Sequence, residues 1–87
     1  MKKIAVVVRD RQSEAFRMSV GLTVLDDQVD IFIMKPVKDD PKTIEELNGA
    51  LDLGLKCYSP IQDERFQLLG LDEFAKRLLE YDHIIPY

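Results

Sequence analysis

The feature that most constrains the fold is the alternation of short apolar runs with helical patterns along a chain of 87 residues. Lys3 to Val8 is a continuous run rich in β-branched residues, and Val29 to Met34 is a second run in which Asp30 is the polar exception. Runs of this kind are typical of strands that are buried on both faces, as in a parallel sheet between two helical layers. Both runs therefore predict strands of an α/β sheet.

Helical spacing predicts a helix from about Glu14 to Asp26, after the first run. Ser13 has the side chain of an N-cap residue, so we expect the helix to begin there. Gly21 lies inside this segment, and a glycine inside a helix usually marks a close contact. We therefore expect a neighbouring element to approach the helix at Gly21.

A second helix is predicted before Gly54, which is a favourable residue just past a helix end. Thr43 and Glu46 form a capping-box pattern at its start. A third helix is predicted to begin at Asp72. Its buried face should consist of Phe74, Ala75, Leu78 and Leu79.

The remaining strands are shorter. Leu55 to Ser59 reads as a strand that Pro60 ends, and His83 to Tyr87 reads as the last strand. Phe66 to Leu69 is a candidate for one more short strand. Strands that alternate with helices are joined by right-handed crossovers in a parallel sheet. We therefore predict one domain, residues 1–87, with a three-layer α/β/α sandwich and a mostly parallel sheet of four to five strands.

Composition narrows the class of partner. The net charge is −4 and the pI is about 4.9, which argues against a nucleic-acid partner. The first apolar run stops at Val8, too short for a signal peptide, and no run approaches the roughly 18 residues of a membrane span. One cysteine cannot form an internal disulfide. These features predict a cytoplasmic protein without a membrane partner, and the small size of the domain favours an oligomer.

In parallel sheets, ligands bind outside the carboxyl ends of the strands. Arg9, Arg11 and Ser13 follow the first strand, Lys35 follows the second, and Ser59 ends the third. These residues are the candidates for binding an anion or another acidic ligand. A solvated charged loop is the favoured interpretation of residues 9–13, because no glycine-rich phosphate loop is present. We expect no cofactor.

Catalytic and metal sites have little support. His83 is the one histidine, and connectivity places it at the amino end of its strand, away from the edge where ligands bind. The acidic pairs lie in loops or at helix ends, where adjacent carboxylates seldom have the opposed pKa values that acid–base catalysis needs. One cysteine and one histidine without a spacing pattern do not form a metal site.

Cys57 is the candidate catalytic residue. It shares one face of its strand with Leu55 and Ser59. Free cysteines are among the most buried residues, whereas a reactive thiol needs exposure and a nearby positive charge. Its place within a strand favours a packed core residue, and a reactive thiol is the alternative.

The whole chain resembles the DsrE/DsrF/DsrH-like family of small α/β sulfur-relay proteins. The segments that carry the resemblance are Lys3–Val8, Ser13–Ala15, Val29–Met34, Leu53–Leu55 and Leu78–Ile85. The resemblance implies about five parallel strands between helical layers and assembly into homo- or hetero-oligomers. It also implies, for members active in sulfur transfer, a persulfide-carrying cysteine at the carboxyl end of the third strand.

This chain departs from the family pattern at that position. Ser59, Pro60 and Ile61 stand where the family cysteine would be, and Cys57 comes two or three residues earlier. The helix that usually follows the third strand is replaced by residues 62–65. The departures favour a structural partner over a sulfur carrier.

Three functional hypotheses follow, and they leave open whether the protein is an enzyme. The first is a non-catalytic or regulatory DsrE-like protein that acts through oligomer or partner assembly in sulfur metabolism. The second is a sulfurtransferase subunit that carries a persulfide on Cys57. The third is a small-ligand binding module of flavodoxin-like architecture, although Asp10 alone does not make a phosphorylation site.

Overall fold

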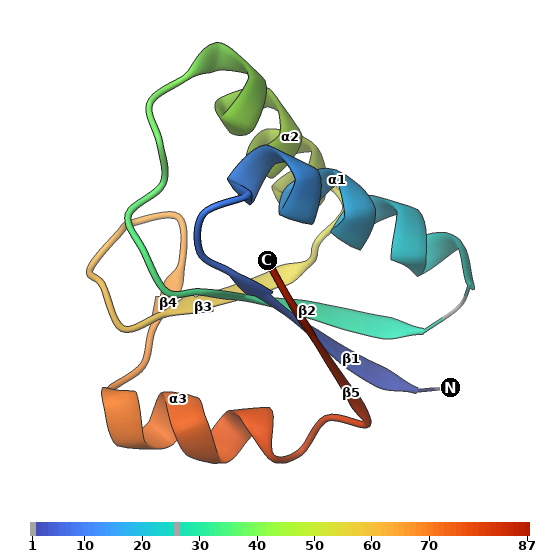
Figure 1. Ribbon diagram of the computed structural model, residues 1–87, viewed down its shortest axis with the longest axis vertical. Helices are drawn as coiled ribbons and strands as arrows, with labels where there is room; N and C mark the ends of the chain where they lie inside the picture. The colour runs from blue at the N-terminus through green and yellow to red at the C-terminus, as the bar shows by residue number, and fades with distance from the viewer. Residues whose placement is uncertain (1, 26) are drawn as a thin grey trace.

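The computed structural model describes residues 2–25 and 27–87 as one open sheet with helices on both faces (Figure 1). The elements in chain order are β1 Lys3–Val8, α1 Gln12–Leu22, the 3₁₀ turn η1 Thr23–Leu25, β2 Gln28–Ile33, α2 Pro41–Asp52, β3 Lys56–Ser59, β4 Gln67–Leu68, α3 Leu71–Leu78 and β5 His83–Pro86. None of the helices in the described ranges is both long and apolar enough to cross a membrane.

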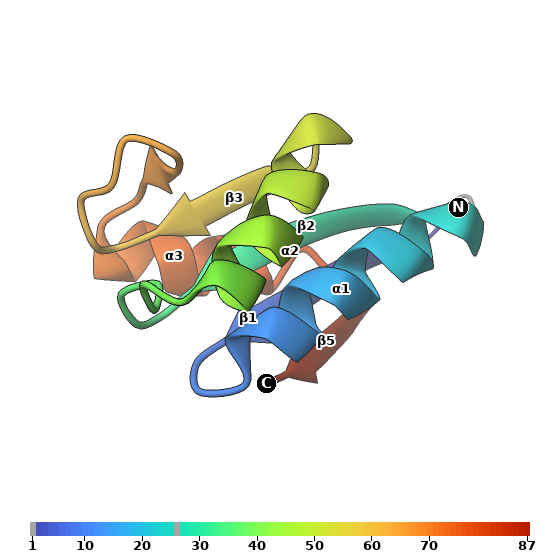
Figure 2. The same cartoon turned by 90° about the horizontal axis from the view of Figure 1, so that it is seen from above.

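The sheet has the strand order β4-β3-β2-β1-β5, and every neighbouring pair is parallel. Helices α1 and α2 lie on one face and α3 lies on the other (Figures 1 and 2). The predicted three-layer α/β/α sandwich is therefore confirmed, with five strands that are all parallel. The short strand expected at Phe66 to Leu69 is present as the two residues of β4.

Alternation along β1 builds two separate cores. Ile4 and Val8 pack with the residues of α1 and α2, whereas Ala5 and Val7 pack with Phe74 of α3. Successive side chains of a strand point to opposite faces, so a central strand needs apolar residues at every position. This requirement explains the unbroken apolar run of β1.

The start of α1 differs from the prediction. Arg11, not Ser13, is the N-cap residue, and no side chain caps the helix. The N–H groups of Asp10 and Arg11 instead donate to the main-chain oxygen of Tyr87, which fixes the turn before the helix. Ser13 therefore lies inside the first turn, and its predicted capping role is wrong.

The end of α1 also corrects two expectations. The α-helix stops at Leu22 and continues as η1, and the predicted end at Asp26 lies outside the described residues. A Cβ atom added at Gly21 would meet no heavy atom within 4 Å. The expected close contact is therefore absent at Gly21, which faces solvent.

The N-cap residue of α2 is Asp40, which lies before the capping box predicted at Thr43. Oδ1 of Asp40 accepts hydrogen bonds from the N–H groups of Lys42 (3.1 Å) and Thr43 (3.2 Å), and the Thr43 hydroxyl donates to the same carboxylate. Pro41 occupies the first helical position, where its missing N–H costs nothing. Asp40 is thus the N-cap residue, and the predicted capping box of Thr43 and Glu46 is wrong.

The predicted helix end at Gly54 is confirmed. Gly54 has a φ of +81°, and its N–H donates to the Leu51 carbonyl at 2.9 Å. The N–H of Leu55 donates to the Ala50 carbonyl at 3.2 Å. These two bonds form a Schellman motif, in which glycine adopts the left-handed conformation at low cost.

Helix α3 presents a different face to the sheet from the one predicted. Gly70, not Asp72, is the N-cap residue. Phe74 is buried against Phe32, with ring centroids 5.2 Å apart, but Ala75 and Leu79 are exposed. Packing of the aromatic ring sets the rotation of the helix, so the predicted burial of Ala75 and Leu79 is wrong.

Candidate functional site

Charged side chains gather at the carboxyl edge of the sheet, in the loops that follow β1 and β2. Nζ of Lys35 lies 2.7 Å from Oδ1 of Asp10, and Nζ of Lys38 donates to the Asp10 carbonyl at 3.0 Å. Arg9 and Arg11 flank Asp10 in the chain. We call Arg9, Asp10, Arg11, Lys35 and Lys38 the carboxyl-edge cluster; its role in binding an anion stays a prediction.

Ion pairing inside this cluster reduces its positive charge. The hydrogen bond from Lys35, helped by the charges of Lys35, Arg9 and Lys38, holds the pKa of the Asp10 carboxyl below its usual range. Arg11 is paired with Glu14, on the first turn of α1. Pairs that are this exposed contribute little to stability and are screened by salt. The cluster nevertheless keeps more cations than carboxylates.

Tyr87 occupies the place next to α1 where an anion would receive hydrogen bonds. Its main-chain oxygen accepts from the N–H groups of Asp10 (3.3 Å) and Arg11 (3.1 Å). The Arg11 guanidinium lies over its ring, 5.1 Å from the centroid, and its hydroxyl lies 2.7 Å from Sδ of Met18. An anion at this point would have to displace the Tyr87 oxygen.

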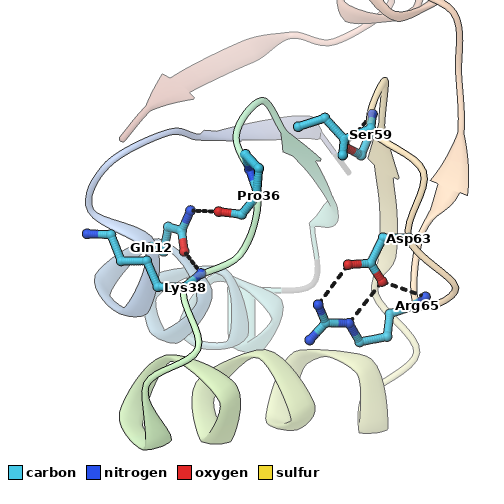
Figure 3. Close-up of polar contacts among 7 residues, drawn as sticks. Gln12, Pro36, Lys38, Ser59, Asp63 and Arg65 are labelled. Carbon is cyan, nitrogen blue, oxygen red and sulfur yellow. Dashed lines mark hydrogen bonds and ion pairs between the residues drawn. The ribbon is translucent and has the colours of Figure 1, made fainter.

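Gln12 joins the two loops of the carboxyl-edge cluster, a role that no sequence pattern indicated (Figure 3). Its Nε2 donates to the carbonyls of Arg9 (3.2 Å) and Pro36 (3.0 Å), and its Oε1 accepts from the N–H of Lys38 (2.8 Å). The side chain is buried. The buried amide thus donates two hydrogen bonds and accepts a third, and together they fix the loops relative to each other.

Ser59 does not join this cluster. It is buried at the end of β3, apart from the Gln12 hydrogen bonds in Figure 3, and its Oγ accepts from the N–H of Ile61 at 3.1 Å. The following loop contains a turn, not a helix, as the sequence predicts. A bidentate contact from Arg65 closes that turn and lowers the pKa of Asp63.

Cys57 lies in the core between the sheet and α1 and α2, and its exposed fraction is 6%. Its nearest polar partner is the Leu55 carbonyl, 3.8 Å from Sγ. Burial raises the pKa of the thiol to about 12, and the negative charge of Asp30 adds to the effect. The packed-residue interpretation agrees with this environment.

A buried polar pair lies toward the amino ends of the strands, on the α3 face. The Tyr81 hydroxyl donates to Oδ2 of Asp30 at 2.5 Å, and Nε2 of Gln28 donates to the same oxygen at 3.1 Å. Lys3 lies over the Tyr81 ring, 4.9 Å from its centroid. Burial and the hydrogen bond to Asp30 raise the pKa of Tyr81. The pair ties the segment after α3 to β2.

His83 begins β5 and is exposed, at the amino edge where connectivity predicts it. Within residues 2–25 and 27–87, no three His, Cys, Asp or Glu side chains gather so that they could hold a metal ion.

Comparison of the chain with protein-family models, curated proteins and solved structures found no significant match. The resemblance to the DsrE/DsrF/DsrH-like family therefore stays a prediction, which rests on the sequence of the strands and helices.

Proposed function

We propose that this chain is a non-catalytic, DsrE-like protein of sulfur metabolism that acts in the cytoplasm by assembling with a second copy or a related subunit. The observation that carries the proposal is the burial of Cys57. The thiolate, not the thiol, attacks sulfur donors. With a pKa of about 12, roughly one thiol in a hundred thousand is ionised at pH 7. A persulfide carrier needs a far more available group.

Exposed apolar side chains on and beside α3 support assembly. Leu71 is 72% exposed, Leu79 is 83% exposed, and Ile84 of β5 is 49% exposed. Single exposed leucines are common, but several beside an uncovered part of a sheet are typical of an interaction surface. We call Leu71, Ala75, Leu79 and Ile84 the α3 apolar surface.

Pro86 makes assembly by strand addition at β5 unfavourable. The N–H of Tyr87 donates to the Val7 carbonyl at 2.8 Å, so it points toward β1. Because successive N–H groups of a strand point to opposite sides, the position of Pro86 faces the open edge, where proline has no N–H to offer. The face of the sheet is the better candidate for a contact.

Native mass spectrometry of protein incubated with an inorganic polysulfide tests this function. We expect an oligomer in which no subunit gains the mass of a sulfur atom. The control is the double variant Cys57→Ser/Gln62→Cys, which has an exposed thiol in the β3–β4 loop and should gain sulfur. Sulfur on Cys57 of the folded wild-type protein would support the sulfurtransferase alternative instead. A retained small molecule would support the ligand-binding alternative.

A further inference from the structure

The α3 side of the sheet is covered by one helix among the described residues, whereas α1 and α2 share the other side (Figure 1). Phe74 packs on Phe32 of β2, and the Arg77 guanidinium lies over the Tyr58 ring of β3, 5.0 Å from its centroid. Helix α3 therefore lies over β2 and β3. The sheet beside it, at β5, leaves Ile84 half exposed.

The exposed leucines of α3 face this uncovered part of the sheet. Residues four apart lie on one side of a helix, so Leu71, Ala75 and Leu79 form a stripe. At about 100° per residue, Leu71 lies about 120° around the helix from Arg77. Since Arg77 faces β3, the stripe faces the opposite side, toward β1 and β5.

Two opposite charges border the stripe on its solvent side. Asp72 lies in the first turn of α3 and Lys76 in the last. Neither takes part in an ion pair in the described part of the chain, whereas Glu73 and Arg77 pair with each other at 3.4 Å. Asp72 and Lys76 are therefore available to a partner that carries the reverse order of charge.

We infer that the α3 apolar surface binds a second copy of this chain, with the two α3 helices antiparallel about a two-fold axis near Ala75. In that arrangement Leu71 packs against Leu79 of the other copy, and Asp72 lies near Lys76 of the other copy. A parallel arrangement would place Asp72 beside Asp72. Only the antiparallel arrangement places Asp72 of each copy near an opposite charge, that of Lys76 of the other copy, as an isologous dimer requires.

This inference deepens the assembly part of the proposed function and rests on it. The contact would bury Leu71, Ala75 and Leu79 of both copies, which are exposed in the single chain. Antiparallel α3 helices also align their dipoles favourably. A second copy therefore satisfies the apolar, charged and dipolar features of one surface together.

A charge-reversal cycle measured by sedimentation equilibrium tests the inference. Asp72→Lys places two lysines together at each contact, and Lys76→Asp places two carboxylates together. Each single variant should raise the dimer dissociation constant about tenfold, and Asp72→Lys/Lys76→Asp should restore it. Leu79→Glu should raise it at least about tenfold by adding a buried charge. Glu64→Lys, which reverses an exposed charge in the β3–β4 loop, is the matched control.

The outcomes separate this inference from the proposed function. A dimer that is indifferent to Leu79→Glu and to both single reversals would overturn the α3 contact and leave assembly in place. A wild-type protein that stays monomeric at all concentrations would overturn the α3 contact and the assembly of two copies. Sulfur loading of Cys57 within an intact, charge-sensitive dimer would overturn the non-catalytic function and leave the α3 contact. All the substituted positions are exposed, so circular dichroism should show unchanged folds.

Discussion

The reactivity of Cys57 toward a thiol reagent can be worked out from its environment. Burial raises the pKa of the thiol from an ordinary value of 9.0 to about 12. At pH 8 the raised pKa makes the thiolate fraction of the folded chain about a thousand times smaller than that of the unfolded chain. With 6% of the residue exposed, steric shielding slows the reaction further. We therefore expect native Cys57 to react with an aromatic disulfide reagent at least about a thousandfold more slowly than unfolded Cys57.

The assay follows the absorbance of the released thiolate at pH 8 over a range of urea concentrations. If the reagent reaches Cys57 only when the protein opens, the rate rises with urea in step with the unfolding equilibrium. Cys57→Ser/Gln62→Cys is the control, because its exposed thiol should react quickly without urea.

A native rate within about tenfold of the unfolded rate, with no dependence on urea, would refute the reasoning. It would mean that Cys57 meets solvent in the folded protein. The sulfurtransferase alternative would then regain its support.

Four stability predictions concern the residues that hold the fold. Phe32→Ala removes a ring that contacts three other aromatic rings, so urea denaturation should show a loss of about 3–5 kcal/mol in the free energy of unfolding; a loss below about 2 kcal/mol would contradict this packing. Asp40→Ala should cost about 1 kcal/mol and Glu46→Ala less than about 0.5 kcal/mol, whereas equal losses would restore the capping box. Gln12→Ala should cost about 1–3 kcal/mol in the same assay, and an unchanged midpoint would count against the loop contact. Finally, as the pH rises from 9 toward 12, the unfolded chain releases the Cys57 proton before the folded chain does. The free energy of unfolding of the wild type should therefore fall relative to that of Cys57→Ala, by at most about 1.4 kcal/mol per pH unit. A difference between the two proteins that does not change with pH would contradict the raised pKa.

The strands could be predicted from the sequence because burial on two faces leaves a strong pattern. β1 matches its predicted bounds, and β2 and β3 differ from theirs by a residue at one or both ends. Met34 falls just past β2 because the chain has reached the edge of the sheet, where it is 45% exposed. Its apolar side chain extends the pattern beyond the strand itself.

Helix starts were harder to predict, because several residues near each start can cap a helix. Asp40 and Thr43 both have suitable side chains, and Pro41 settles the choice by fitting the first helical position. At α1 the start depends on Tyr87, more than seventy residues away in the chain. No local preference can report such a contact.

In the carboxyl-edge cluster, too, one part of the arrangement follows from the sequence and another part does not. That Arg9 and Lys35 lie near one another follows from strand order alone, since β1 and β2 are parallel neighbours. The buried position of Gln12 depends on how the two loops meet, and a glutamine among charged residues carries no sign of it. The rotation of α3 likewise depends on where Phe74 meets Phe32.

The burial of the thiol follows from the register of β3. Cys57 pairs with Ile31, and both side chains enter the core under α1 and α2. A cysteine placed two residues later would also be buried, because Ser59 occupies that position on the same face and is 1% exposed. After Cys57, the next exposed side chain is that of Gln62, beyond Pro60, where the chain has left the sheet. A sulfur carrier built on this sheet would need its cysteine past the end of β3, and this chain has a half-buried proline and isoleucine there instead.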